Sequence, residues 1–167
     1  MSPMPHALRV LRADYADPRH ASALVGLLEA YALDPAGGGK PLPAIARENL
    51  VPGLAARPHA FSVLAFEGED PVGLVNCLEG FSSFAGRPLV NIHDVFVAAG
   101  RRGRGIAEAM LGLVERIARE RGACKLTLEV LSGNEGAKRL YARAGFGAYA
   151  LDPAMGDARF WQKPLSP

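Results

Sequence analysis

One continuous stretch, residues 95–110, restricts the possible folds of this chain more than any other. It begins as an apolar, strand-like run, passes through a turn rich in glycine and arginine, and ends in an amphipathic helix. The turn holds Gly100, Gly103 and Gly105. Glycine adopts backbone conformations that other residues avoid, so a strand can lead directly into a helix here. The stretch predicts a protein in which strands and helices pack around one sheet.

The start of this helix predicts an anion site. Unpaired N–H groups and the positive end of the helix dipole favour negative charge, and glycine lets the backbone approach a ligand closely. Arg101, Arg102 and Arg104 lie at that positive end, where basic side chains destabilise a helix. A bound anion, most simply a diphosphate, explains them. The alternative is a solvated turn in which the arginines are incidental.

Composition limits the class of protein. The chain has 167 residues, of which 49% are hydrophobic and 22% charged, as expected for one globular domain over residues 1–167. Its net charge of +2 is too small for a polycation that binds nucleic acid. The segment 1–20 lacks the apolar core of a signal peptide, and no apolar run reaches the roughly 20 residues of a membrane span. We therefore expect a soluble cytoplasmic protein with no nucleic-acid or membrane partner; whether it forms a homodimer is left open.

The residue pattern predicts an α/β (α+β) fold, with a single mixed, mostly antiparallel central sheet of about six or seven strands flanked by about four helices. The expected strands are 8–11, 61–66, 72–78, 89–97, 125–131, 146–151 and 158–163. The expected helices are 18–33, 44–51, 105–121 and 135–144. Pro52 and Gly53 are expected to end the second helix, and residues 80–88 to form a loop.

The glycine-arginine turn resembles the acetyl-CoA-binding signature of the GNAT superfamily, R/Q-x-x-G-x-G/A. The matching residues are Arg102, Gly103, Arg104, Gly105, Ile106 and Ala107. The resemblance implies the GNAT acyl-CoA N-acyltransferase fold, with an acetyl-CoA-binding core over about residues 89–146. It also implies that main-chain N–H groups of the turn hold the CoA pyrophosphate. The preceding residues Val95, Phe96 and Val97 would bind the pantetheine arm through their main-chain atoms.

A second stretch resembles a later motif of the same family. Its residues are Asn134, Ala137, Tyr141 and the pair Gly145-Phe146. Asn134 is suited to cap the helix that follows, and helical spacing alone makes Tyr141 a core aromatic. The resemblance instead implies that Tyr141 protonates the departing CoA thiolate. A phenol with an ordinary pKa of about 10 can donate to a thiolate whose thiol has a pKa of about 8.5.

A general base is expected in the strand before the turn, because only a neutral amine attacks an acyl group. His93 is the predicted base, since histidine has an ordinary pKa of about 6.5; the alternative is a structural histidine. The segment His93–Val97 is similar to the Glu-Asp-aromatic-aromatic-Val segment of the spermidine/spermine and thialysine acetyltransferases, with His93 replacing the glutamate. Strand alternation predicts one face with Asn91, His93 and Val95, and the other with Ile92, Asp94 and Phe96.

The sequence predicts an N-acetyltransferase that moves the acetyl group of acetyl-CoA to a primary amine of a small molecule in a ternary complex. Two alternatives remain: a protein or peptide N-acetyltransferase, and an acyl-CoA-binding module without catalysis. Glu129 is also an alternative base. Cys77 and Cys124 are expected to be unpaired thiols, and no residue spacing suggests a metal site. Candidates for the acceptor pocket are Tyr31, Glu79, Phe81, Asp94, Glu129 and Trp161.

Overall fold

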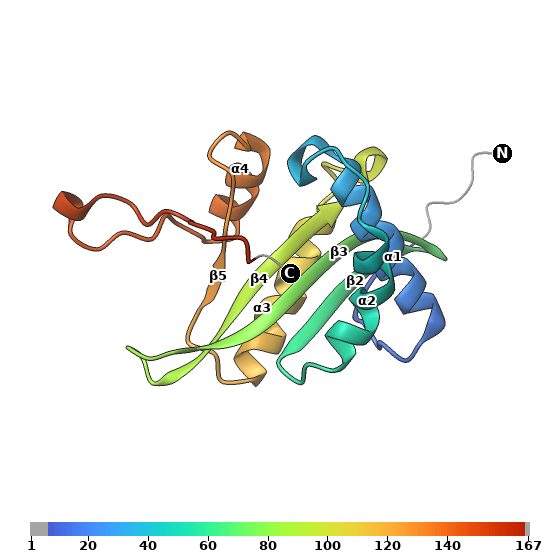
Figure 1. Cartoon of the computed structure of the whole chain (residues 1–167), viewed down its shortest axis with the longest axis horizontal. Coiled ribbons are helices and arrows are strands. Elements are labelled where there is room, and N and C mark those ends of the chain that lie inside the picture. The colour runs from blue at the N-terminus through green and yellow to red at the C-terminus, as the bar shows by residue number, and fades with distance from the viewer. Residues whose placement is uncertain (1–6, 166–167) are drawn as a thin grey trace. The chain divides into compact units, whose positions relative to one another are not determined.

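The computed structural model describes residues 7–165, and the chain divides into two compact units, Met1–Leu128 and Glu129–Pro167. The first unit contains a five-stranded sheet in the order β1-β2-β3-β4-β5 (Figure 1). The β1/β2, β2/β3 and β3/β4 pairs are antiparallel, and β4/β5 is parallel. The strands are β1 Leu8–Arg12, β2 Ala60–Glu67, β3 Asp70–Ser82, β4 Arg87–Val97 and β5 Leu126–Leu128.

The expected mixed, mostly antiparallel sheet is confirmed, but the expected number of strands is wrong. Residues 146–151 and 158–163 form no strand; one isolated bridge joins Ala150 and Asp157. Side chains there are exposed, 58% for Tyr149 and 75% for Leu151, so residues that favour a strand have no apolar layer to pack against. Residues 80–88 are also not simply a loop, because β3 and β4 continue pairing to Ser82 and Arg87.

Four α-helices lie in the described residues: α1 Pro18–Leu33, α2 Ala44–Ala55, α3 Ile106–Glu120 and α4 Glu135–Arg143. Short 3-10 turns occupy Pro35–Gly37, Ala99–Arg101 and Pro153–Met155. The expected end of the second helix at Pro52 is wrong. Proline removes only its own N–H donor, and its carbonyl still accepts from the Ala56 N–H at 3.0 Å, so one further turn forms. No helix of residues 7–165 is long and apolar enough to cross a membrane.

The sheet of the first unit has helices on both faces. Figure 1 shows α1 and α2 against one face and α3 against the other. Leu24 and Leu27 of α1 belong to a core cluster with Leu74 and Phe96 of the sheet. On the α3 face, the end of the Met110 side chain lies 2.8 Å from where a Cβ on Gly73 would stand, so this helix packs closely on β3. The C-terminal half of β4 therefore contributes to the core under α1 and leads towards the start of α3.

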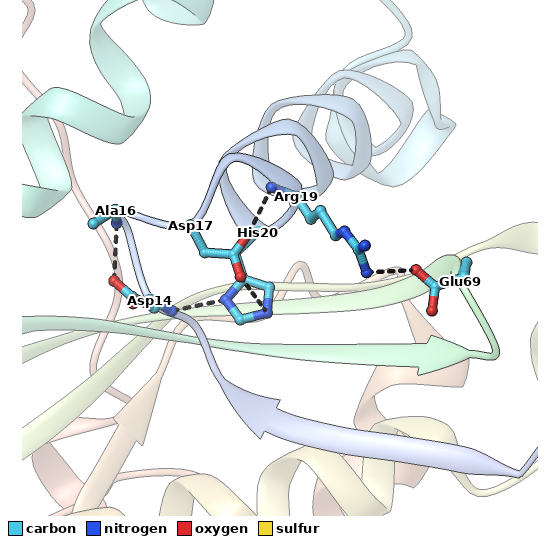
Figure 2. A network of polar contacts seen from close by, with 6 residues as sticks. All are labelled: Asp14, Ala16, Asp17, Arg19, His20 and Glu69. Carbon is cyan, nitrogen blue, oxygen red and sulfur yellow. Dashed lines mark hydrogen bonds and ion pairs between the residues drawn. The ribbon is translucent and has the colours of Figure 1, made fainter.

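A network of polar contacts sets the direction of α1 (Figure 2). Asp17 caps the helix, its Oδ1 accepting from the Arg19 N–H at 2.8 Å. The Asp14 N–H donates to Nδ1 of His20 at 3.0 Å, and Arg19 pairs with Glu69 at 3.0 Å. Tyr31, one of the predicted acceptor residues, lies in the last turn of α1. These contacts therefore help to place Tyr31 over the sheet.

Candidate active site

β4 has a bulge at His93. Asn76 of β3 pairs with Asp94 and Cys77 pairs with Ile92, which leaves His93 as an extra residue on β4. The bulge interrupts the alternation, so Ile92 and Asp94 lie on opposite faces of the sheet, and the expectation that they share one is wrong. His93 itself is exposed. Asp94 lies on the same face of the sheet as Phe96, as the sequence predicted.

Two predicted site residues, Asp94 and Tyr31, come together on the face covered by α1. The Tyr31 ring stacks on Phe96, with ring centroids 5.6 Å apart. Burial raises the pKa of the Tyr31 phenol, and the negative charges of Asp94 and Asp34 raise it further. The phenol therefore stays protonated and can donate a hydrogen bond at neutral pH. The pair forms a polar spot above an apolar core.

Three residues that the sequence analysis did not single out connect to this spot through a chain of hydrogen bonds. Tyr15 Oη lies 2.9 Å from Ser62 Oγ, and Ser62 Oγ donates to Asn76 Oδ1 at 2.6 Å. Asn76 Nδ2 then donates to Asp94 Oδ2 at 3.0 Å. Ser62 is 0% and Asn76 4% exposed. In the sequence, Ser62 and Asn76 were recognisable as polar residues, each within an otherwise apolar strand. We call Tyr15, Ser62, Asn76 and Asp94 the polar ladder.

β4 presents an open main-chain edge. Its pairing with β5 ends at Ile92 and Leu128, whereas its pairing with β3 continues to Val97. Over residues 93–97, the edge turned away from β3 has no strand partner within the described part of the chain. Val95 and Val97 turn their main-chain N–H and C=O groups towards this edge, whereas those of Phe96, between them, pair with Leu74 of β3. A main-chain edge of this kind can pair with an extended ligand that carries amide groups.

The open edge leads into the predicted turn. Gly103 and Gly105 have positive φ angles, 74° and 76°, and Gly105 is the N-cap of α3 without any side-chain hydrogen bond. A Cβ added to either glycine would meet no atom within 4 Å, so space lies in front of the backbone. After the turn, Ile106 is buried and Ala107 partly buried. The helix start thus has unpaired N–H donors beside open space, the arrangement that favours an anion.

Two arginines of the turn fold back onto the β2–β3 hairpin. Glu67, whose side chain is 13% exposed, lies 3.2 Å from Arg101 Nε and 3.1 Å from Arg104 Nη1. Arg101 also pairs with Asp70 at 3.2 Å. Carboxylates of the protein balance these two positive charges. The sequence pattern suggested that the arginine side chains balance a bound anion. Since these two arginines are already paired, the capacity of the turn to bind an anion rests mainly on its main-chain N–H groups.

Arg102 joins the turn to the end of α1. Its Nη2 pairs with Asp34 Oδ2 at 2.6 Å, its Nε donates to the Val97 carbonyl at 3.0 Å, and its guanidinium lies 5.7 Å from the centroid of the Phe96 ring. This hydrogen-bonded pairing lowers the pKa of Asp34. The three contacts hold the end of β4, the turn and the end of α1 in one arrangement.

Other predicted acceptor residues do not join Tyr31 and Asp94. Glu79 forms an ion pair with Arg121 at 2.8 Å and lies 3.7 Å from His59. Phe81 is 67% exposed on β3. Within residues 7–165, no three histidine, cysteine or acidic residues lie together as metal ligands.

The second unit contains the later motif. Asn134 caps α4, its Oδ1 accepting from the Ala137 N–H at 3.1 Å, as the sequence predicted. Tyr141 contacts Phe146 edge-on, with ring centroids 5.9 Å apart, and Gly145 ends the helix with φ 90°. Glu129 and Trp161 also lie in this unit, and both are exposed. The predicted site residues are therefore divided between the two units.

Comparison with known proteins identifies relatives by sequence. Streptothricin acetyltransferase of Streptomyces lavendulae is 38% identical over 99 residues, covering 53% of this chain and 52% of that protein. An uncharacterized N-acetyltransferase of Methanocaldococcus jannaschii is 38% identical over 77 residues, covering 46% of this chain and 34% of that protein. The chain thus spans about half the length, or less, of these curated relatives.

Solved structures with low sequence identity share the fold. An aminoglycoside acetyltransferase from an uncultured soil metagenomic sample, in complex with trehalose, has a TM-score of 0.75 and 17% identity, with 95% of this chain and 97% of that chain covered. AAC(6')-Iy in complex with a bisubstrate analog has a TM-score of 0.74 and 17% identity, with 95% and 99% covered.

The family model decides the assignment. Residues 24–146 match the model described as the acetyltransferase (GNAT) family. This range includes α1 from Leu24 onwards, β2 to β5, the glycine-arginine turn and the later motif through Phe146. The resemblance inferred from the two motifs is confirmed, and the chain belongs to the acetyltransferase (GNAT) family.

Proposed function

We propose that this chain is an acetyl-CoA-dependent N-acetyltransferase that acetylates a primary amine of a small molecule by direct attack in a ternary complex. The observation that carries the proposal is the open edge of β4, which leads into a turn with two glycines of positive φ and a helix start without a side-chain cap. Amide-pairing and anion-binding groups follow one another along the chain there. A pantetheine arm joined to a diphosphate requires that order.

Named main-chain groups would hold the co-substrate. The segment from Val95 to Val97 would bind the pantetheine amides through the main-chain groups of Val95 and the N–H of Val97, because the Val97 carbonyl already accepts from Arg102. The N–H groups of residues 103–107 would bind the pyrophosphate. The roles of Arg102 and Arg104 are then to shape the turn, since both already pair with carboxylates. Asn134 and Ala137, at the start of α4, would also contact the co-substrate, as the family motif implies.

Side chains would move the protons. Acetyl-CoA supplies an acyl group activated as a thioester. The His93 imidazole accepts the proton that the amine loses as the new C–N bond forms. Main-chain N–H groups of β4 stabilise the negative charge on the carbonyl oxygen, and Tyr141 Oη gives a proton to the sulfur as the C–S bond breaks. His93, on its bulge, is accessible to an incoming amine.

Relatives support a small-molecule acceptor. The sequence relative from Streptomyces lavendulae is named for acetylation of streptothricin, and a structural neighbour is an aminoglycoside acetyltransferase in complex with sisomicin. Both names point to amine-bearing small molecules. The half-buried carboxylate of Asp94 beside Tyr31 suits a cationic acceptor.

The test measures release of free thiol from acetyl-CoA with a panel of amines: streptothricin, sisomicin, spermidine, putrescine and a peptide with a free N-terminus. Binding of CoA is measured separately by calorimetry. We expect thiol release with at least one small amine and none with the peptide. Release with the peptide alone would identify a peptide acetyltransferase. CoA binding without release from any amine would identify a non-catalytic module, and absence of CoA binding would refute both.

A further inference from the structure

The polar ladder has a direction. The Asp94 carboxylate only accepts hydrogen bonds, so the Asn76 amide must turn its NH₂ group towards Asp94 and its oxygen towards Ser62. Ser62 uses its single proton on that oxygen. Its Oγ can then only accept from Tyr15, which makes the Tyr15 phenol the first donor. Every donor in the ladder points towards Asp94.

Such a ladder is unusual in the middle of a core. Ser62 is buried as completely as its apolar neighbour Val63, both 0% exposed, and Asn76, at 4%, nearly as completely as Val75 at 0%. Buried polar groups are no more stabilising than well-packed apolar ones, and they are costly when any partner is missing. In the described residues, no buried side-chain polar atom lacks a partner. The ladder thus orients one carboxylate at a site where apolar residues would serve packing equally well.

Asp94 differs from the other partly buried carboxylates of the first unit. Four of them form an ion pair with an arginine: Glu29 with Arg47, Asp34 with Arg102, Glu67 with Arg101 and Arg104, and Glu79 with Arg121. The fifth, Asp17, caps the N-terminus of α1, where the helix dipole offsets its charge. Asp94 has no such pair among residues 7–165. The side chains that interact with it are the amide of Asn76, the phenol of Tyr31 and the thiol of Cys77, all of them neutral. An uncompensated carboxylate of this kind attracts a cation.

We propose that Asp94 binds an ammonium group of the acceptor, and that Asn76, Ser62 and Tyr15 are positioning residues that hold its carboxylate for that purpose. This inference rests on the proposed function and narrows its substrate class. The amine that is acetylated must be neutral when it attacks, so the ammonium at Asp94 is a second amino group of the same molecule. The preferred acceptors are therefore diamines or larger polycationic amines.

A matched pair of acceptors tests this proposal. Putrescine and n-butylamine present similar primary amines, but only putrescine carries a second ammonium group. We expect the wild type to have a kcat/KM at least about tenfold higher for putrescine, mainly through a lower KM. Asp94→Asn removes the charge and should abolish this preference. Asn76→Leu should reduce it strongly, Ser62→Ala less, and Tyr15→Phe least, in the order of their distance from Asp94 along the ladder.

The control is Val63→Ala, a truncation of the fully buried neighbour of Ser62 that lies outside the ladder. A purely structural role would lower the thermal stability of Ser62→Ala and Val63→Ala alike without changing the ratio between the two acceptors. We expect Val63→Ala to keep the wild-type ratio. Equal ratios in wild type, Asp94→Asn and Asn76→Leu would overturn the proposal.

Binding measurements separate this proposal from the proposed function. If the wild type acetylates neither amine, the enzymatic assignment fails for this acceptor class, and calorimetry with putrescine alone then decides the role of the ladder. Wild-type binding that is lost in Asp94→Asn and weakened in Asn76→Leu, but kept in Val63→Ala, would support it. Absence of putrescine binding to the wild type, or equal binding by all variants, would refute it.

Discussion

At the scale of single residues, the proposed chemistry depends most directly on the phenol of Tyr141. Tyr141→Phe keeps the edge-on contact with Phe146 but removes the proton donor. We expect kcat to fall by about 10²-fold or more, with KM for acetyl-CoA nearly unchanged. Steady-state kinetics would measure both. Tyr149→Phe, in the same unit, is the matched control, and an equal loss in the two variants would count against a specific role for Tyr141.

The two cysteines differ in their surroundings. Both are free, with Cys77 0% exposed on β3 and Cys124 partly exposed. Burial raises the pKa of the Cys77 thiol well above its usual range, so almost no reactive thiolate forms at neutral or mildly alkaline pH. We expect iodoacetamide to modify Cys124 much faster than Cys77 in the folded protein, and both at similar rates in urea. Mass spectrometry of the labelled peptides would show it; rapid native labelling of Cys77 would contradict this burial.

Contacts that depend on strand pairing could not be predicted from the sequence. The alternation of β4 correctly placed Asp94 with Phe96, but it could not locate the bulge at His93, because bulges depend on how two strands pair. The same holds for the polar ladder. Ser62 and Asn76 are visible as polar residues in apolar strands, but only the register of three strands brings them into line with Asp94. Local patterns thus identify unusual residues without identifying their partners.

At the scale of elements, the start of α3 gives a direct test of backbone conformation. Gly105 has φ 76°, where alanine is disfavoured by about 1–2 kcal/mol, whereas Gly112 lies in the helix on an exposed position. Gly105→Ala should therefore lower the free energy of unfolding by about that amount, and Gly112→Ala should raise it by about 0.5–1 kcal/mol. Urea denaturation would measure both.

The same two variants test the anion site. An alanine Cβ at position 105 would project into the space in front of the turn, so Gly105→Ala should also weaken CoA binding, whereas Gly112→Ala should not. Calorimetry with CoA would distinguish them. CoA affinities that are unchanged in both variants would place the pyrophosphate elsewhere.

The ion pair between Arg102 and Asp34 links two elements, and its contribution should depend on pH. The folded-state pKa of Asp34 lies below its ordinary value of 3.8, so the stabilisation is present at neutral pH and disappears as the pH falls through the depressed value. Asp34→Asn keeps an acceptor for the Ala36 N–H but removes the charge. We expect it to lower the free energy of unfolding at neutral pH by about 1 kcal/mol or less, because Arg102 is half exposed.

Urea denaturation over a range of pH measures this effect. The difference between wild type and Asp34→Asn should shrink towards zero as the pH falls below the depressed pKa of Asp34, where the side chain at this position is uncharged in both proteins. Glu48→Gln, which changes an exposed carboxylate of α2, serves as a comparison for general charge effects. A difference that stays constant over the whole pH range would show that the ion pair does not stabilise the fold.

The elements with strong periodicity were predicted best. Helix α3 was expected at 105–121 and runs over Ile106–Glu120, and α4 was expected at 135–144 and runs over Glu135–Arg143. Both carry clear apolar stripes and end signals that depend on nearby residues alone. Residues 146–151 are apolar and aromatic enough to suggest a strand, but a strand needs a neighbour to pair with, and no local pattern supplies one. The wrong strand count follows from that difference.

At the scale of the whole molecule, the charge distribution explains why an arginine-rich turn need not attract nucleic acid. The net charge is +2, and all three arginines of the turn pair with carboxylates. Nucleic-acid binding requires many uncompensated cations that together displace condensed counterions. A diphosphate instead requires only a few N–H donors directed at one point, which a helix start provides. The same basic stretch can therefore be selective for a small anionic ligand.

This selectivity is measurable as a shift in thermal unfolding. A ligand that binds only the folded state at about 100 times its Kd stabilises it by about 2.7 kcal/mol, which for a chain of this size raises the Tm by about 5–10 °C. We expect CoA to produce such a shift. A short DNA oligonucleotide at the same phosphate concentration and physiological salt should produce none, because compensated arginines release few counterions. A larger shift with the oligonucleotide than with CoA would mean that the turn recognises a polyanion, and the assignment of the turn to CoA would then be wrong.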